Sequence, residues 1–226
     1  MRTINGVVVG KVKKVNDPEN LGRVKVFFPW LSERNNSFWA RIATFMTGGD
    51  RGSWFMPEEG DEVLVAFEHG DVQHPYVIGF LWNGRDNPPI KDNDIKIRRL
   101  KTVSGHIVEF DDRNGNEKIH IITQGEQEIE LNDVPVPQIR IKTKNGHEIL
   151  MTEAPPAHIK IQTAGGNFIE LTDAPPSLMI STAGISISAQ AGMITLNCLQ
   201  ASVNASALLN INAPMTVLAG LFKPPL

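Results

Sequence analysis

The chain has 226 residues, of which 41% are hydrophobic and 21% charged, and its formal net charge is −3. This length allows one large or two small domains, and the ordinary composition excludes a low-complexity disordered chain. The negative charge argues against nucleic acid as a main partner, because phosphate backbones attract positive surfaces, and one cysteine excludes an internal disulfide.

The first residues of the chain do not have the pattern of a secretory signal peptide. They contain no apolar core and no cleavage pattern of a secretory signal, and no apolar run in the chain is long enough to span a bilayer. We therefore expect synthesis in the bacterial cytoplasm without a signal peptide.

Residues 1–88 predict a small β-barrel. Val24, Val26 and Phe28 alternate with residues of the other face, and Asn16 to Gly22 has the composition of a turn. Five such short strands suit a closed barrel of the OB type, because closure leaves no free sheet edge. The runs rich in Val, Ile, Phe and Trp are 6–15, 23–30, 38–45, 62–68 and 74–82.

The boundary between domains is predicted at Asn83 to Pro89, which holds turn formers without an apolar period. Residues 89–100 are charged and are interpreted as a linker. Residues 101–226 are expected to form a second, elongated domain.

An internal repeat of about twenty residues predicts the architecture of this second domain. Each unit holds two short alternating strands, a glycine-bearing turn and an acidic or proline-containing turn. The clearest copies are QIRIKT at 138–143 with HIKIQT at 158–163, and EILMTEAPP at 148–156 with FIELTDAPP at 168–176; 118–135 and, less regularly, 105–112 are earlier copies.

One chain alone would leave the apolar strand faces and both strand edges exposed. We therefore predict an intertwined triple-stranded β-helix, a homotrimer in which each strand pairs with a neighbour from another chain and the apolar residues face a shared axis. The expected axial core is Ile119, Ile121, Ile129, Leu131, Ile139, Ile141, Ile149, Met151, Ile159, Ile161, Ile169, Leu171, Ile185, Ile187, Ile194 and Leu196.

The end of the chain is uncharged from Pro175 to Phe222. Such a segment has little charge to desolvate if it enters lipid. Leu221, Phe222 and Leu226 are candidate contacts for a tip protein, or they cap the needle itself. Cys198 alternates with Ile194 and Leu196, which favours a small core residue over a nucleophile.

The motifs of the first domain resemble a known family, the valine-glycine repeat protein G and phage baseplate assembly protein V group of contractile-tail spikes. The resemblance continues into the start of the repeats. It rests on LGRVKV at 21–26 with FPW at 28–30, FWARIA at 38–43, PEEGDEVLVAFE at 57–68, PYVIG at 75–79, LWNG at 81–84, and the stretches 104–112 and 115–119.

This resemblance implies an OB barrel at the base of a trimeric β-helical needle. It implies a role as the membrane-puncturing central spike of a contractile tail or injection machine, with a hub protein at the barrel, a conical tip protein of the proline-alanine-alanine-arginine (PAAR) type, and the target cell envelope as partners. The chain starts directly at the barrel, which favours a hub on a separate chain or a shortened chain. Phage tail, tailocin and secretion-like machines all stay open.

No catalytic residue, metal site or cofactor is expected. Glu58, Glu59, Asp61 and Glu62 form an acidic cluster, but a solvated turn before a strand explains it better than acid–base chemistry. The six histidines contain no His-x-His motif. Alternative interpretations are a trimeric fibre that binds surface glycans and, more weakly, a nucleic-acid-binding barrel in which the tryptophans stack on bases.

Overall fold

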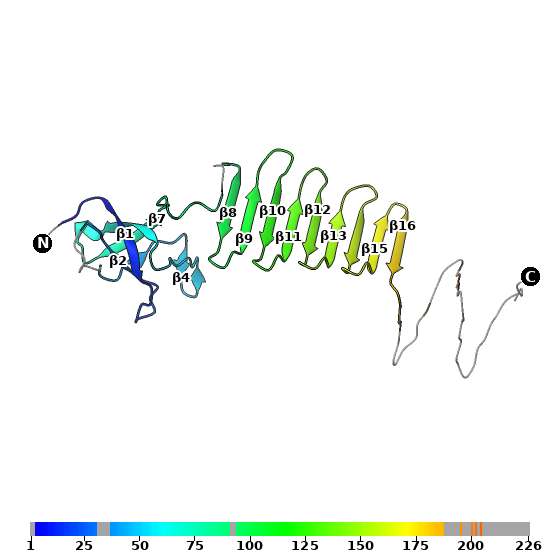
Figure 1. The fold of residues 1–226 in the computed structure, drawn as a ribbon, viewed down its shortest axis with the longest axis horizontal. Coiled ribbons are helices and arrows are strands. Elements are labelled where there is room, and N and C mark those ends of the chain that lie inside the picture. Colours follow the sequence, from blue (N-terminus) through cyan, green and yellow to red (C-terminus); the bar gives the residue numbers. More distant parts are fainter. Residues whose placement is uncertain are drawn as a thin grey trace, which may run out of the picture. The chain divides into compact units, whose positions relative to one another are not determined.

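The computed structural model describes residues 3–30, 37–90 and 94–187, together with positions 195, 200, 202 and 204. Its described residues form sixteen strands and a single 3-10 turn, Glu68–Gly70. The all-β class is confirmed. The strands divide into a barrel and a ladder, which are described separately (Figure 1). No helix among the described residues is long and apolar enough to span a membrane.

The barrel is a five-stranded sheet in the order β2-β1-β6-β7-β3. Neighbours pair antiparallel except β3 and β7, which are parallel. Backbone hydrogen bonds join Val24 and Ala40 just before β2 and β3, at 2.8 and 3.0 Å, so the two edge strands meet and the sheet closes. This is the OB topology. The bounds are β1 Val7–Lys14, β2 Lys25–Phe27, β3 Arg41–Ile42, β6 Glu62–Phe67 and β7 Pro75–Phe80.

The interior of the barrel holds the residues that alternation predicted. Val24, Val26 and Phe28 are at most 3% exposed, and Val63 and Val65 on β6 are fully buried. Gly10 lets β1 approach them, because a Cβ there would lie 2.3 Å from Cγ1 of Val26. Each interior Val or Phe contributes about 1.5–3 kcal/mol through burial, so this cluster stabilises the barrel without a disulfide.

The loop between β1 and β2 is organised by Asp17. Its carboxylate accepts hydrogen bonds from the backbone N–H of Glu19 and of Leu21, each at 3.1 Å, and from Nε of Arg23 at 2.8 Å. The side-chain hydrogen bond from Arg23 holds the pKa of Asp17 far below its usual value, against the effect of desolvation. The loop predicted from its turn residues is therefore held by one ionised carboxylate.

The second domain is a nine-stranded antiparallel ladder in which every strand pairs with its neighbours in sequence (Figure 1). From β10 to β15, every second strand begins twenty residues after the last, which is the predicted period. Their bounds are β8 Ile97–Lys101, β9 Ile107–Asp111, β10 Lys118–Ile122, β11 Glu128–Asn132, β12 Gln138–Lys142, β13 Glu148–Thr152, β14 His158–Gln162, β15 Phe168–Asp173 and β16 Pro176–Ser181.

Two details of the ladder differ from the expectation. Residues 97–100, interpreted as linker, lie in β8, because cross-strand ion pairs of Arg98 with Asp112 and of Arg99 with Glu109 stabilise a strand that lacks an apolar period. Strands β9 to β15 have both edges paired within the chain, whereas we expected each strand to pair with a neighbour from another chain. The short turns place consecutive strands of the chain side by side.

The glycine-bearing turns share one geometry. In the turn after β12, Thr143 accepts from the N–H of Gly146 at 2.9 Å and its hydroxyl accepts from the N–H of His147 at 3.0 Å. The same pattern begins at Thr102, Thr123 and Thr163. These turns fix the pairing register of every second hairpin.

Several predicted positions lie outside the ladder. Ile185 and Ile187 are described but belong to no strand, and they are 58% and 72% exposed. Ile194, Leu196, Cys198, Leu221, Phe222 and Leu226 lie outside the described residues.

β4 (Thr47–Gly48) and β5 (Arg51–Gly52) form a small separate hairpin on the barrel domain.

Candidate functional site: the apolar face of the ladder

One face of the ladder carries two unbroken columns of large apolar side chains. The columns arise because the residues at the second and fourth positions of strands β9 to β15, and at the third and fifth positions of β16, stand directly opposite their counterparts on the next strand. The first runs Phe110, Ile119, Leu131, Ile139, Met151, Ile159, Leu171, Leu178; the second runs Val108, Ile121, Ile129, Ile141, Ile149, Ile161, Ile169, Ile180. We call this set the apolar face. It includes every predicted core residue from Ile119 to Leu171.

The apolar face is open in the single chain. Ile139 is 40% exposed and Ile161 48%, and most other members from Ile119 to Ile180 have similar values. A monomeric soluble protein rarely leaves so large a continuous apolar surface in water. Each fully buried Ile or Leu would stabilise an assembly by roughly 1.5–3 kcal/mol before the entropy of association.

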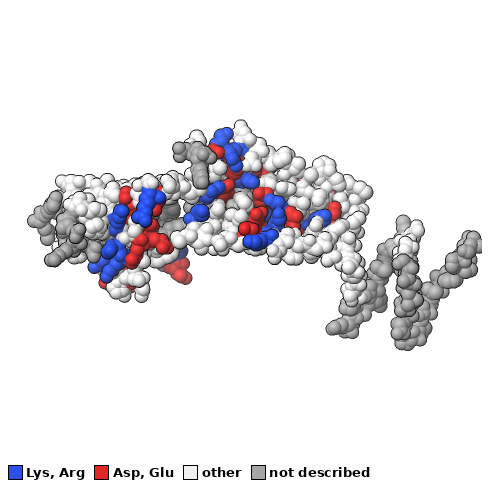
Figure 2. All heavy atoms as spheres, in the orientation of Figure 1, with Lys and Arg blue, Asp and Glu red and all other residues white. Residues whose placement is uncertain are grey.

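The opposite face is polar and better shielded. Glu130 at its centre is 6% exposed and accepts hydrogen bonds from Arg140 at 2.9 Å, Asn132 at 3.0 Å and Lys118 at 3.2 Å. Desolvation opposes ionisation of Glu130, but these hydrogen bonds and nearby cations hold its pKa below the usual value. Figure 2 shows acidic and basic side chains interspersed over the ladder. The charged groups around Glu130 are therefore paired within one chain, whereas the apolar face stays open to solvent.

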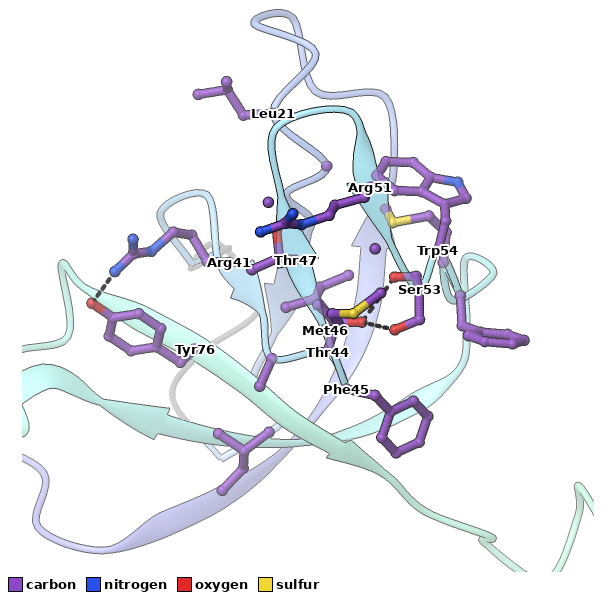
Figure 3. Close-up of a pocket in the computed structure, with 18 of the residues that line it drawn as sticks. Leu21, Arg41, Thr44, Phe45, Met46, Thr47, Arg51, Ser53, Trp54 and Tyr76 are labelled. Atoms are coloured by element: carbon purple, nitrogen blue, oxygen red, sulfur yellow. Dashed lines mark hydrogen bonds between the residues drawn. The ribbon is translucent and has the colours of Figure 1, made fainter.

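The barrel carries a second exposed apolar feature, a groove of about 1660 Å³ beside the β4–β5 hairpin (Figure 3). Phe45 is 94% exposed, Trp54 72% and Phe55 59%, and all three line it. Periodicity did not single out Phe45 or Phe55, because they lie in connections between strands. Their signal in the sequence is the spacing of bulky residues around a glycine-rich turn.

A smaller polar hollow of about 450 Å³ lies beside Trp39 and Tyr76. The Arg41 guanidinium lies 4.8 Å from the Tyr76 ring and donates to its hydroxyl at 2.6 Å, while Tyr76 donates to Glu68 at 2.8 Å. The cations here are already paired. The arrangement therefore offers no open basic stripe for a phosphate backbone.

The acidic cluster lies in the exposed turn that leads into β6. Asp61 accepts a hydrogen bond from the N–H of Glu58 at 2.8 Å, as a turn-closing carboxylate does. Among the described residues, no group of three His, Cys, Asp or Glu side chains could hold a metal ion.

Two family models match the chain. Residues 8–82, which contain the barrel, match the type VI secretion system/phage-baseplate injector OB domain. Residues 138–209, which include strands β12 to β16, match the phage baseplate V C-terminal trimerisation domain. The second match supports assembly in threes, and the open apolar face independently favours association with other chains.

Curated relatives agree with these models. The chain is 32% identical over 116 residues to the type VI secretion system spike protein VgrG3 of Vibrio cholerae serotype O1, covering 47% of this chain and 11% of that protein. It is 29% identical over 140 residues to the spike protein VgrG1b of Pseudomonas aeruginosa, covering 56% and 19%. The actin cross-linking toxin VgrG1 of Vibrio cholerae is 30% identical over 113 residues, covering 46% and 10%. The chain thus spans under a fifth of the length of these relatives.

Proposed function

The chain belongs to the family of phage baseplate V and type VI secretion spike proteins, and from this premise we propose that it is the membrane-puncturing central spike of a contractile tail or injection machine. The proposed role is mechanical and not enzymatic. The apolar face is the observation that carries it, because its two columns extend over every strand from β9 to β16 without a charged residue.

The proposed assembly is a homotrimer in which three ladders pack their apolar faces against each other. Each ladder keeps its own strand pairing, so the three chains associate through side chains and not through strand edges. Closing three faces on one axis would shield both columns and leave the charged faces outward. The match of residues 138–209 to a trimerisation domain supports the number three.

Resistance to load would follow from the ladder itself. Each strand from β9 to β15 is hydrogen-bonded along its length to two neighbours, as β13 is to β12 and β14, and a trimer would support every pair from inside. Breaking one rung then requires rupture of several hydrogen bonds and of buried apolar contacts together. A needle built in this way would transmit the force of sheath contraction to a small area of the target envelope.

We propose one binding partner for each end of the chain. A baseplate hub protein would hold the barrel domain. A tip protein of the PAAR type would sit at the C-terminal end, where Leu221, Phe222 and Leu226 are candidate contacts. The assembled spike would reside in the baseplate of the particle and meet the target cell envelope when the sheath contracts.

The first test is the mass of the purified chain by light scattering, with gel electrophoresis in SDS of unheated and boiled samples. The proposal expects the mass of three chains and a slow band that boiling abolishes. A soluble monomer would overturn the needle.

A second test addresses puncture. Contractile particles that lack their spike would be complemented with this chain or with Ile139→Asp, and leakage of target cells would be measured. Leakage restored by the wild-type chain alone supports the mechanical role. Restoration by a variant that has lost the trimer would contradict it.

A further inference from the structure

The barrel groove is a feature that the proposed spike leaves unexplained. Its rim carries Phe45, Trp54 and Phe55, and Ile78 and Phe80 on β7 are 44% and 51% exposed along the same groove. Charged residues are few in this lining, namely Arg41, Asp50 and Arg51 on the barrel. Contiguous exposed aromatic surface with a sparse polar rim is typical of a protein–protein contact.

The aromatic rim is held rigidly. Ser53 donates its N–H to the carbonyl of Met46 at 3.0 Å, and the Thr44 hydroxyl donates to the carbonyl of Ser53 at 2.8 Å, which closes the base of the hairpin (Figure 3). Trp54 lies against Gly22, where an added Cβ would come within 2.8 Å of the indole. The backbone that carries Phe45 and Trp54 is therefore held in place, which lowers the entropic cost of docking on this rim.

The groove also lies next to the exit of the chain from the barrel. Phe80 ends β7, and Trp82, which is 64% exposed, follows two residues later. Only residues 83–96 separate this point from β8, a span of at most about 50 Å when fully extended. Three ladders that associate on one axis would hold three barrels within this reach, at an effective concentration of the order of millimolar.

We propose that this groove is the surface through which each barrel packs against the barrel of a second copy of this chain. The proposal rests on the trimer of the proposed function. It explains why the most exposed aromatic residue of the barrel, Phe45, lies at the base of a hairpin that is closed by hydrogen bonds. The contact continues the apolar association of the ladders into the base of the spike.

Phe45→Glu is the direct test, because the 94% exposure of Phe45 in one chain makes the substitution harmless unless another molecule covers the site. The full-length variant is compared with wild type by thermal denaturation. The same substitution is then made in the Ile139→Asp background, in which the ladders do not associate. We expect Phe45→Glu to lower the melting temperature of the trimer and to have no effect in the dissociated background.

Radical footprinting of the full chain gives a second readout that needs no change in the barrel. Labelling of Phe45 and Trp54 should be several-fold lower in the trimer than in the Ile139→Asp chain. Phe38, which is 55% exposed and lies outside the groove, should label equally in both. A trimer in which Phe45 labels as fully as in the dissociated chain, with a neutral Phe45→Glu, overturns the barrel contact alone. A wild-type monomer by light scattering overturns the trimer itself.

Discussion

Glu126 adopts the left-handed backbone conformation, with φ of 62°, at the place in its turn that Gly146, with φ of 91°, holds twenty residues later. Both residues donate their N–H to the carbonyl of the turn-opening threonine at 2.9 Å. The turn requires a positive φ at this position, and glycine adopts it without the crowding that a Cβ causes. One repeat therefore contains a residue that its own turn disfavours.

This relationship predicts opposite effects for two substitutions. Glu126→Gly should raise the free energy of unfolding by up to about 1 kcal/mol, because the exposed pair of Glu126 with Lys144, at 3.4 Å, contributes little. Gly146→Ala should lower it by about 1 kcal/mol, since a Cβ at Gly146 meets only ordinary contact with Ala164 at 3.8 Å and the cost is conformational. Urea denaturation of both variants measures this, and equal signs would contradict the shared turn geometry.

Ile139→Asp should abolish the trimer. Three carboxylates would meet on the axis, and each buried unpaired charge costs several kcal/mol. Gln138→Asp is the matched control, because it places the same charge one residue away on the polar face. Light scattering should give the mass of one chain for the first variant and of three for the second. Retention of the trimer by Ile139→Asp would show that the apolar face is not the interface.

Glu130→Gln should destabilise the ladder by about 1.5–3 kcal/mol, the usual loss for hydrogen bonds to a charged group. The carboxylate is 6% exposed and serves three donors, so its neutralisation leaves Lys118 and Arg140 without their shared anion. Glu170→Gln is the control. Its pair with Lys160 is 4.0 Å long and more than a quarter exposed, and should contribute under about 1 kcal/mol. Comparable losses of denaturation midpoint in both would argue against a special role for Glu130.

Protonation of the Asp111 carboxylate should lower the stability of the fold in acid. The Arg113 side chain, at 2.8 Å through Nε, and further hydrogen bonds lower the pKa of this buried carboxylate to about 2, against the effect of desolvation. The folded state thus binds its proton later than the unfolded state, so the stabilisation is complete above about pH 4 and is lost as the pH falls towards 2. Asp111→Asn should remove this part of the pH dependence. Denaturation midpoints at about pH 7 and about pH 2 measure it, and an unchanged slope in the variant would refute the assignment.

Much of the fold was predictable because burial imposes a period. In the barrel, Val63 and Val65 alternate with half-buried neighbours, and in the ladder Ile159 and Ile161 repeat Ile139 and Ile141 at the twenty-residue spacing. The family match to a trimerisation domain agrees with the prediction that these repeats associate in threes. Period-two patterning carries this information because a strand with one buried face must alternate.

The sequence could not show which strands pair. The two strand edges of a repeat unit could pair with the next unit of the same chain or with another chain, and the sequence pattern is the same in both cases. The turn geometry, as at Thr143, selects pairing with the next strand of the same chain. Strand β8 was missed because Arg98 and Arg99 give it no apolar period, and their partners Asp112 and Glu109 lie more than nine residues away. Phe45 was missed because an exposed residue in a connection obeys no period.

Because the strand register is the same in each repeat, the length of the ladder is set by the number of repeat units. Each unit of twenty residues adds two strands, and neighbouring strands lie about 4.8 Å apart, so one unit corresponds to roughly 10 Å. Recombination between two copies at equivalent points, such as Thr143 and Thr163, adds or removes a whole unit and rejoins both apolar columns in frame. A lineage can thus adjust the reach of such a protein in fixed steps by unequal crossing-over, without evolving a new interface at each length.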